Sequence, residues 1–220
     1  MSTPLMMVNI NGIFALCRME QTKEAIHMRV TKAQAQANRA HIVETASIQF
    51  REHGYDGVGV ADLMAAAGFT HGGFYKHFGS KSDLMAESAA CSISKTVEQS
   101  KGIDPAQFIE YYLSREHRDN PGTGCTMAAL SADAARQSEA VKATFANGIE
   151  SILAASVAAG AHADDKTQQQ ARAKTIDLFA HALGAVLLSR SCPDDSPLAD
   201  EILEVCRAKM QAQLAYAQAS

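Results

Sequence analysis

Apolar residues recur every three or four positions along most of this 220-residue chain, a spacing that predicts amphipathic helices. The first strong pattern covers residues 32–53 and ends at Gly54. Its apolar face carries Ile42, Val43, Ala46 and Phe50. Its polar face, which we expect to lie in water, carries Arg39, Glu44, Gln49 and Arg51.

Two shorter segments come next, joined by a tight turn. Residues 60–67 are rich in helix formers, and Gly68 can adopt the left-handed conformation that ends a helix. Thr70 is suited to cap a second segment, 71–78, in which two phenylalanines four residues apart share one face. Because its outer side carries polar, basic and aromatic groups, the pair predicts a helix-turn-helix suited to the major groove of DNA.

The remaining pattern is also helical. Ser80 followed by Asp83 predicts a capped helix over 80–100, and Pro105 is placed to begin the next helix. Further helices are predicted over 125–137, 139–160, 170–191 and 198–217, with a loop at 118–124 and a polar link at 162–170.

Composition narrows the chemistry. A hydrophobic content of 47%, with 5 prolines and no tryptophan, fits an all-helical protein with a real core. The five cysteines are scattered without a CxxC pair, which argues against a zinc site or a disulfide framework and fits a reducing cytoplasm. We expect no metal, no cofactor and no catalytic residue, since phosphate-loop, HExxH and GxSxG motifs are absent from the sequence. The enzymatic alternative, Cys125 with His117 or His181 as base, has no support in the spacing.

Charge is distributed unevenly. Residues 28–81 carry six basic and four acidic side chains, whereas residues 82–220 carry 12 basic and 18 acidic ones. We therefore expect only the front of the chain to meet a polyanion.

The first 27 residues differ from the rest. Leu5–Cys17 is apolar but interrupted by polar residues and too short to cross a membrane, and no basic segment precedes it as in a secretory signal. We expect a disordered tail over residues 1–28, and we hypothesise that translation can begin at Met28.

The helix-turn-helix region carries a family resemblance. Between about residues 39 and 84 it resembles the N-terminal DNA-binding domain of TetR-type (TetR/AcrR) transcriptional regulators. The resemblance implies a helical body of variable sequence that binds a small inducer and forms a homodimer. It rests on the ordered set Ala46, Phe50, Gly54, Leu63, Ala67, Gly68, Gly73, Phe74, Tyr75, Phe78, Ser80, Lys81 and Leu84.

The resemblance also implies which residues meet DNA. His71 and Gly72 would lie near base edges, and Tyr75 would bond a phosphate oxygen, although packing for Tyr75 and plain solvation for His71 are the alternatives. Two positions depart from the family pattern: Met64 replaces a small residue, and Gly59 replaces a capping serine or threonine, which loses a cap and a phosphate contact. The implied DNA-binding set is Gly59, Thr70, His71, Gly72, Tyr75, Lys76, His77 and Lys81.

The helical body supplies the candidate ligand pocket. Cys125 either lines this pocket, senses an electrophile, or is a small buried residue. The last alternative is favoured, because no cation that could lower the thiol pKa lies near Cys125 in sequence. The pocket residues expected from helix faces are Phe108, Tyr111, Tyr112, Cys125, Met127, Leu130, Phe145, Phe179 and His181.

The last two predicted helices carry wide apolar bands. A monomer could bury these bands internally, but the resemblance favours packing against a second copy. The expected dimer interface is Phe179, Ala180, Leu183, Gly184, Leu187, Ile202, Val205, Cys206 and Met210.

The sequence thus predicts an all-α fold. We expect an N-terminal three-helix helix-turn-helix DNA-binding domain over 29–80, followed by a larger helical ligand-binding and dimerisation domain over 81–220. The expected function is sequence-specific transcriptional regulation in the cytoplasm, by a homodimeric repressor that a small-molecule inducer releases from double-stranded DNA. The alternatives are a DNA-binding architectural protein without a ligand and, from another class, an enzyme that depends on cysteine and histidine.

Overall fold

The computed structural model describes residues 31–157 and 165–219. The predicted tail and the hypothesised start at Met28 lie outside the described residues. The chain divides into two compact units, residues 1–37 and 38–220. Of the described residues, the first unit holds only the beginning of helix α2. The contacts that build the core and the candidate sites lie within the second unit.

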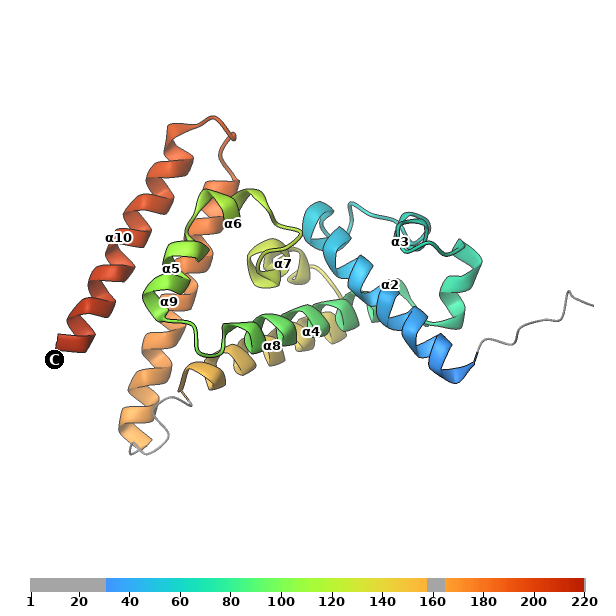
Figure 1. Cartoon of the computed structure of the whole chain (residues 1–220), viewed down its shortest axis with the longest axis horizontal. Coiled ribbons are helices and arrows are strands. Elements are labelled where there is room, and N and C mark those ends of the chain that lie inside the picture. The colour runs from blue at the N-terminus through green and yellow to red at the C-terminus, as the bar shows by residue number, and fades with distance from the viewer. Residues whose placement is uncertain (1–30, 158–164, 220) are drawn as a thin grey trace, which may run out of the picture. The chain divides into compact units, whose positions relative to one another are not determined.

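All regular structure in the described ranges is helical, which confirms the all-α prediction. None of the described helices combines the length and the apolar character needed to cross a membrane. The elements in Figure 1 are α2 (Lys32–His53), α3 (Val60–Ala66), the 3-10 helix η1 (His71–Lys76), α4 (Lys81–Ser100), α5 (Pro105–Tyr112), α6 (Arg115–Asp119), α7 (Thr126–Ala134), α8 (Glu139–Val157), α9 (Asp165–Arg190) and α10 (Pro197–Ala219).

Several predicted helix ends are confirmed by their capping contacts. Helix α2 has the predicted bounds, and Gly54 comes after it with φ of +75°. Gly68 takes φ of +78° after α3, and the Asp83 amide donates to the Ser80 hydroxyl at 3.1 Å at the start of α4. Pro105 occupies the first turn of α5.

Two predicted irregular segments were wrong. Helix α9 begins at Asp165, so most of the expected link at 162–170 is helical, because its lysine and glutamines favour helix even without an apolar face. Arg118 and Asp119 belong to α6 and not to a loop. The Ser114 hydroxyl caps that helix by accepting from the His117 amide at 3.2 Å.

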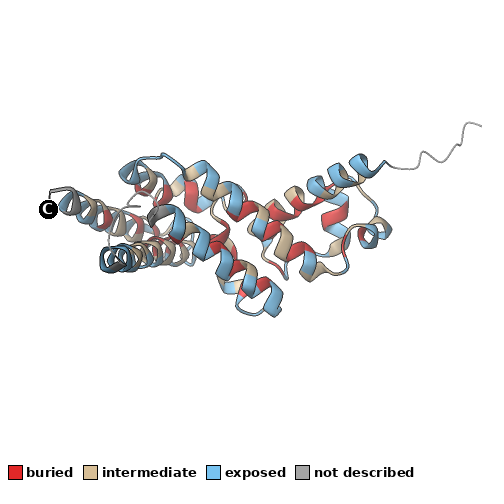
Figure 2. Ribbon diagram, turned by 90° about the horizontal axis from the view of Figure 1, so that it is seen from below, coloured by how far each residue is buried: buried red, intermediate tan, exposed pale blue. Residues whose placement is uncertain are grey.

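One core runs from the helix-turn-helix region into the helical body. Phe50, Leu63 and Phe74 are buried together with Phe145 of α8 in a single apolar cluster that also draws on α4 and α7. Helices α4 and α8 lie side by side, as do α9 and α10 (Figure 1). Figure 2 shows buried residues alternating with exposed ones along these helices. A second cluster fills the space between α5, α9 and α10.

Arg51 corrects the expected polar face of α2. Its side chain is half-buried, because its Nε donates to the Gly122 carbonyl at 2.9 Å and its Nη1 donates to the Ser47 and Ser92 hydroxyls, each at 2.5 Å. The Ser92 and Thr126 hydroxyls are hydrogen-bonded to each other at 2.7 Å. One guanidinium thus joins α2 to α4 and to the loop before α7.

A second link joins the turn after α2 to α7. The Tyr55 amide donates to the Asp133 carboxylate at 3.0 Å. The Tyr55 ring is buried and meets Phe50 edge-on, with the ring centroids 5.0 Å apart.

Candidate nucleic-acid interface

The segment from Thr70 to Lys76 displays the predicted base-facing and phosphate-facing groups. Phe74 is buried as predicted, and the neighbouring Tyr75 is 69% exposed. Thr70, His71, Gly72 and Lys76 are also exposed. Thr70 occupies the N-cap position, but its side chain makes no capping bond, and its carbonyl accepts from the Gly73 amide at 2.9 Å.

The flanking residues of the predicted DNA-binding set are more enclosed. His77 and Lys81 are half-buried. The Lys81 ammonium donates to the Tyr55 carbonyl at 2.5 Å and lies 5.9 Å from the centroid of the Phe50 ring. A lysine has three donors, so this bond leaves others for a phosphate, and its contact with DNA stays a prediction.

Gly59 and Met64, the two positions that depart from the family pattern, both fit into the fold. Gly59 caps α3 without a side chain, and its amide donates to the Asp62 carboxylate at 3.2 Å. Met64 is fully buried, and its Cε methyl would lie 3.7 Å from a Cβ at Gly73. The larger residue is therefore accommodated where η1 has no side chain.

The predicted pocket residues differ in where they lie and in how far they are buried. Met127, Leu130 and Phe145 are buried in the cluster shared with the helix-turn-helix region, and Tyr112 is buried in the second cluster. Cys125 packs against both clusters. The set is completed by Phe108, Phe179 and His181, which are half-buried, and by Tyr111, which is exposed.

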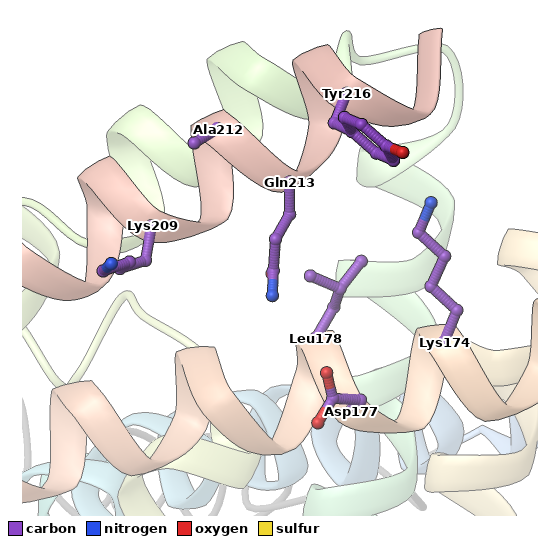
Figure 3. A pocket seen from close by; sticks show the side chains of 7 residues that line it. All are labelled: Lys174, Asp177, Leu178, Lys209, Ala212, Gln213 and Tyr216. Carbon is purple, nitrogen blue, oxygen red and sulfur yellow. The ribbon is translucent and has the colours of Figure 1, made fainter. Parts of the chain in front are cut away.

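Two hollows lie elsewhere. An open groove of about 450 Å³ separates α9 from α10 and is lined by Lys174, Asp177, Leu178, Lys209, Ala212, Gln213 and Tyr216. Figure 3 shows Gln213 and Leu178 pointing toward each other across it. A hollow of about 340 Å³ between α4 and α8 is lined by residues that include Ile93, Val97 and Gly148. Neither set of lining residues includes a predicted pocket residue.

Cys125 has neighbours that the sequence could not reveal. Its backbone amide donates to Nε2 of His117 at 3.1 Å, and its thiol lies beside the Tyr112 hydroxyl. The guanidinium groups of Arg51 and Arg190 interact electrostatically with it. Folding therefore gives this cysteine polar neighbours that are not next to it in sequence.

His117 is held as one neutral tautomer. Its Nε2 accepts from Cys125, so Nδ1 carries the proton and donates to the Tyr112 carbonyl at 2.7 Å. Burial lowers the pKa of His117 and the nearby Arg190 lowers it further, whereas the bond to the carbonyl opposes them.

The pKa of His117 predicts a loss of stability in mild acid. The unfolded chain binds the proton more tightly than the folded one, so stability should fall as the pH drops below about 6.5, the ordinary pKa of histidine. Urea unfolding midpoints measured from about pH 7.5 down to about pH 5.5 would show the effect. His117→Gln should flatten the dependence, and an equally steep dependence in that variant would assign the effect to other groups.

The predicted dimer residues differ in their availability. Ala180 and Val205 are exposed, and a Cβ at Gly184 would meet open space. Phe179, Leu183, Leu187, Ile202 and Cys206 are half-buried. Met210 is only 3% exposed and packs inside the second cluster, which leaves it little surface for a partner.

The expected interface set leaves out three exposed apolar residues of α9 and α10. Leu188 is 61% exposed, and Ile176 and Leu198 are also exposed. Ile176, Ala180, Gly184 and Leu188 recur every four residues along α9, and this spacing was the signal that could have added Leu188 to the set.

Comparison with known proteins finds a family model that matches the helix-turn-helix region. Residues 42–87 match the model of a family described as "Bacterial regulatory proteins, tetR family". This range contains η1 with its exposed Tyr75 and Lys76.

Residues 42–87 form a TetR-family domain.

The curated relatives that the chain matches are regulators by name. It is 31% identical to the HTH-type transcriptional repressor DhaR of Mycobacterium sp. (strain GP1) over 116 residues, which cover 47% of this chain and 56% of that protein. It is 41% identical to the HTH-type transcriptional regulator AcrR of Shigella flexneri over 59 residues, 27% of each chain. The matches thus span from about a quarter to just over half of these relatives' lengths.

Solved structures share the fold over more of the chain. The reduced form of Escherichia coli NemR has a TM-score of 0.60 at 22% identity and covers 79% of this chain and 94% of its own. A TetR-family transcriptional regulator from Agrobacterium tumefaciens has a TM-score of 0.63 at 20% identity, over 81% of this chain and 98% of its own. At these identities the likeness establishes the fold alone.

Proposed function

We propose that this chain is a sequence-specific transcriptional regulator, a homodimeric repressor that a small-molecule inducer releases from its operator. Residues 29–80 would be the DNA-binding domain and residues 81–220 the ligand-binding and dimerisation domain. The supporting observation is the exposed surface of η1, which displays His71, Tyr75 and Lys76 within the range that matches the family model. The regulators named among its relatives support the same role.

The proposed site is built for recognition and not for catalysis. We infer that the chain is not an enzyme and that it works in the cytoplasm. Residues 71–78 would be the recognition segment, and the two segments, one per protomer, would enter successive major grooves about 34–36 Å apart. The acidic body would keep the rest of the molecule away from phosphate, so binding would depend on two copies and on low salt.

Inducer release would use the links between the helix-turn-helix region and the body. A ligand can shift a two-state equilibrium only by its differential affinity for the two states. Arg51 links α2 to the loop before α7, and Asp133 of α7 accepts a hydrogen bond from the turn after α2. A ligand that moves this loop or α7 would therefore change the position of α2.

The direct test selects duplexes from a random library with the full-length protein. We expect an enriched, roughly palindromic sequence that the protein binds in a mobility shift, with unrelated DNA competing poorly. Uniform binding to all duplexes would favour the architectural alternative. Absence of binding at low salt would overturn the proposed function.

The dimer proposal predicts the effect of one charged substitution. Leu188→Glu should weaken self-association by about tenfold, because a buried carboxylate at an apolar interface must be desolvated. Sedimentation velocity over a range of concentrations would measure it. Ile149→Glu, at an exposed apolar position on α8, is the matched control and should leave association unchanged. Equal association by both variants would place the interface away from Leu188.

A further inference from the structure

The recognition segment cannot hold its own geometry. Helix η1 has six residues in a 3-10 conformation, and its N-cap Thr70 gives no side-chain bond. Such short helices are marginal in water without tertiary support. Phe74 and Phe78 anchor one side of the segment in the core, but apolar contacts alone fix its angle only loosely.

Arg39 of α2 contacts the end of this segment directly. Its Nη1 donates to the carbonyl of His77, the C-cap residue of η1. Its Nε donates to Glu87 Oε1 at 3.1 Å, and its Nη2 donates to Glu87 Oε2. Its guanidinium carbon lies 4.3 Å from the centroid of the Phe78 ring. One planar group therefore bridges α2, the end of η1 and helix α4.

The value of this contact lies in geometry more than in charge. The side chains of Arg39 and Glu87 are 38% and 39% exposed, and ion pairs this close to solvent add little to stability. Arginine, however, presents five donors in a rigid plane, which lets it bond a carboxylate through two nitrogens and a carbonyl through a third. Lysine keeps the charge but cannot reproduce this fork.

We propose that Arg39 and Glu87 are positioning residues for DNA recognition. They set the angle of the recognition segment against α4, acting through the His77 carbonyl and the Phe78 ring without touching DNA. This inference rests on the proposed function, and it adds two residues that lie outside the predicted DNA-binding set.

The proposal makes a prediction opposite to that of simple electrostatics. Glu87→Gln removes a negative charge close to the end of η1, so charge alone predicts tighter binding to DNA. Loss of positioning predicts weaker binding to the selected duplex. Arg39→Lys keeps the net charge, so a loss of affinity in that variant also reports geometry.

The chain offers a matched control. Glu44 of α2 pairs with Lys95 of α4, and their side chains are 47% and 51% exposed. Glu44→Gln therefore breaks an ion pair between the same two helices and changes the net charge by as much as Glu87→Gln does. Unlike the pair of Arg39 and Glu87, this pair is not bonded to η1.

The experiment compares full-length Arg39→Lys, Glu87→Gln and Glu44→Gln with wild type on the selected duplex and on an unrelated duplex. We expect the first two to bind the selected duplex about tenfold more weakly and the unrelated duplex within about twofold of wild type. Glu44→Gln should bind both as wild type or slightly more tightly. Wild-type or tighter binding of the selected duplex by Glu87→Gln would overturn the proposal, as would equal losses on both duplexes.

A second measurement does not need DNA. In the free protein, amide hydrogen exchange over residues 71–80 should be faster in Arg39→Lys and Glu87→Gln than in Glu44→Gln, with similar urea midpoints for all three. If wild type selects no duplex, the proposed function fails, while this exchange pattern still decides whether the two residues hold the segment. Unchanged exchange over 71–80 would overturn the inference independently of DNA.

Discussion

Arg118→Ala is expected to lower the free energy of unfolding by about 3 kcal/mol, because several buried acceptors lose their partner at once. Arg118 is only 3% exposed. Its Nη2 donates to the carbonyls of Ser189 and Cys192, both at 3.0 Å, and its Nη1 donates to Asp194 at 2.9 Å. The Ser189 carbonyl lies in the last turn of α9, where a helix leaves its acceptors unsatisfied, and Cys192 lies just beyond the end of that helix.

Urea unfolding monitored by circular dichroism would measure this loss. The matched control is Lys142→Ala, which removes a cation from an exposed pair with Glu139 and should change stability by less than about 0.5 kcal/mol. Similar losses in both variants would show that water replaces Arg118 at the end of α9.

Lys76→Glu is expected to weaken binding to the selected duplex by about 100-fold at low salt, since the substitution reverses one charge in each of two recognition segments. Lys76 is exposed in the last turn of η1, on the segment proposed to enter the major groove. Because fewer counterions would be released, the dependence of log affinity on log salt should become shallower by about 2 for the dimer.

Mobility shifts over a series of salt concentrations would measure both quantities. Lys101→Glu changes the charge equally at an exposed position beyond α4 and should bind within a few-fold of wild type. Wild-type affinity and salt dependence in Lys76→Glu would remove this lysine from the interface.

Local patterns accounted for most of the fold. The bounds of α2, the cap at Ser80 and the start of α5 at Pro105 all depend on residues a few positions apart, which the sequence displays directly. Arg51 was misplaced because its main partner, the Gly122 carbonyl, is 71 residues away. Periodicity shows which face of a helix is apolar, but it cannot show that a polar side chain on the other face finds a distant carbonyl.

The candidate sites also differ in how far the sequence could predict them. The exposure of His71, Tyr75 and Lys76 results from their spacing against the buried Phe74, so it could be predicted locally. The ligand pocket could not, because it depends on how α5, α7, α8 and α9 pack together. The exposed Tyr111 and the buried Met210 illustrate this, because the pattern of each helix did not indicate how far either side chain is buried.

The shared apolar cluster has a consequence for modularity. Phe50 and Phe74 are packed in the same core as Met127 and Phe145, so a cut after residue 80 would divide one core and not separate two. A chimaera that joins this DNA-reading segment to the body of another regulator would have to rebuild the inner faces of α4, α7 and α8 as well. The part of the chain that chooses the DNA sequence and the part proposed to hold the inducer would therefore have to change together.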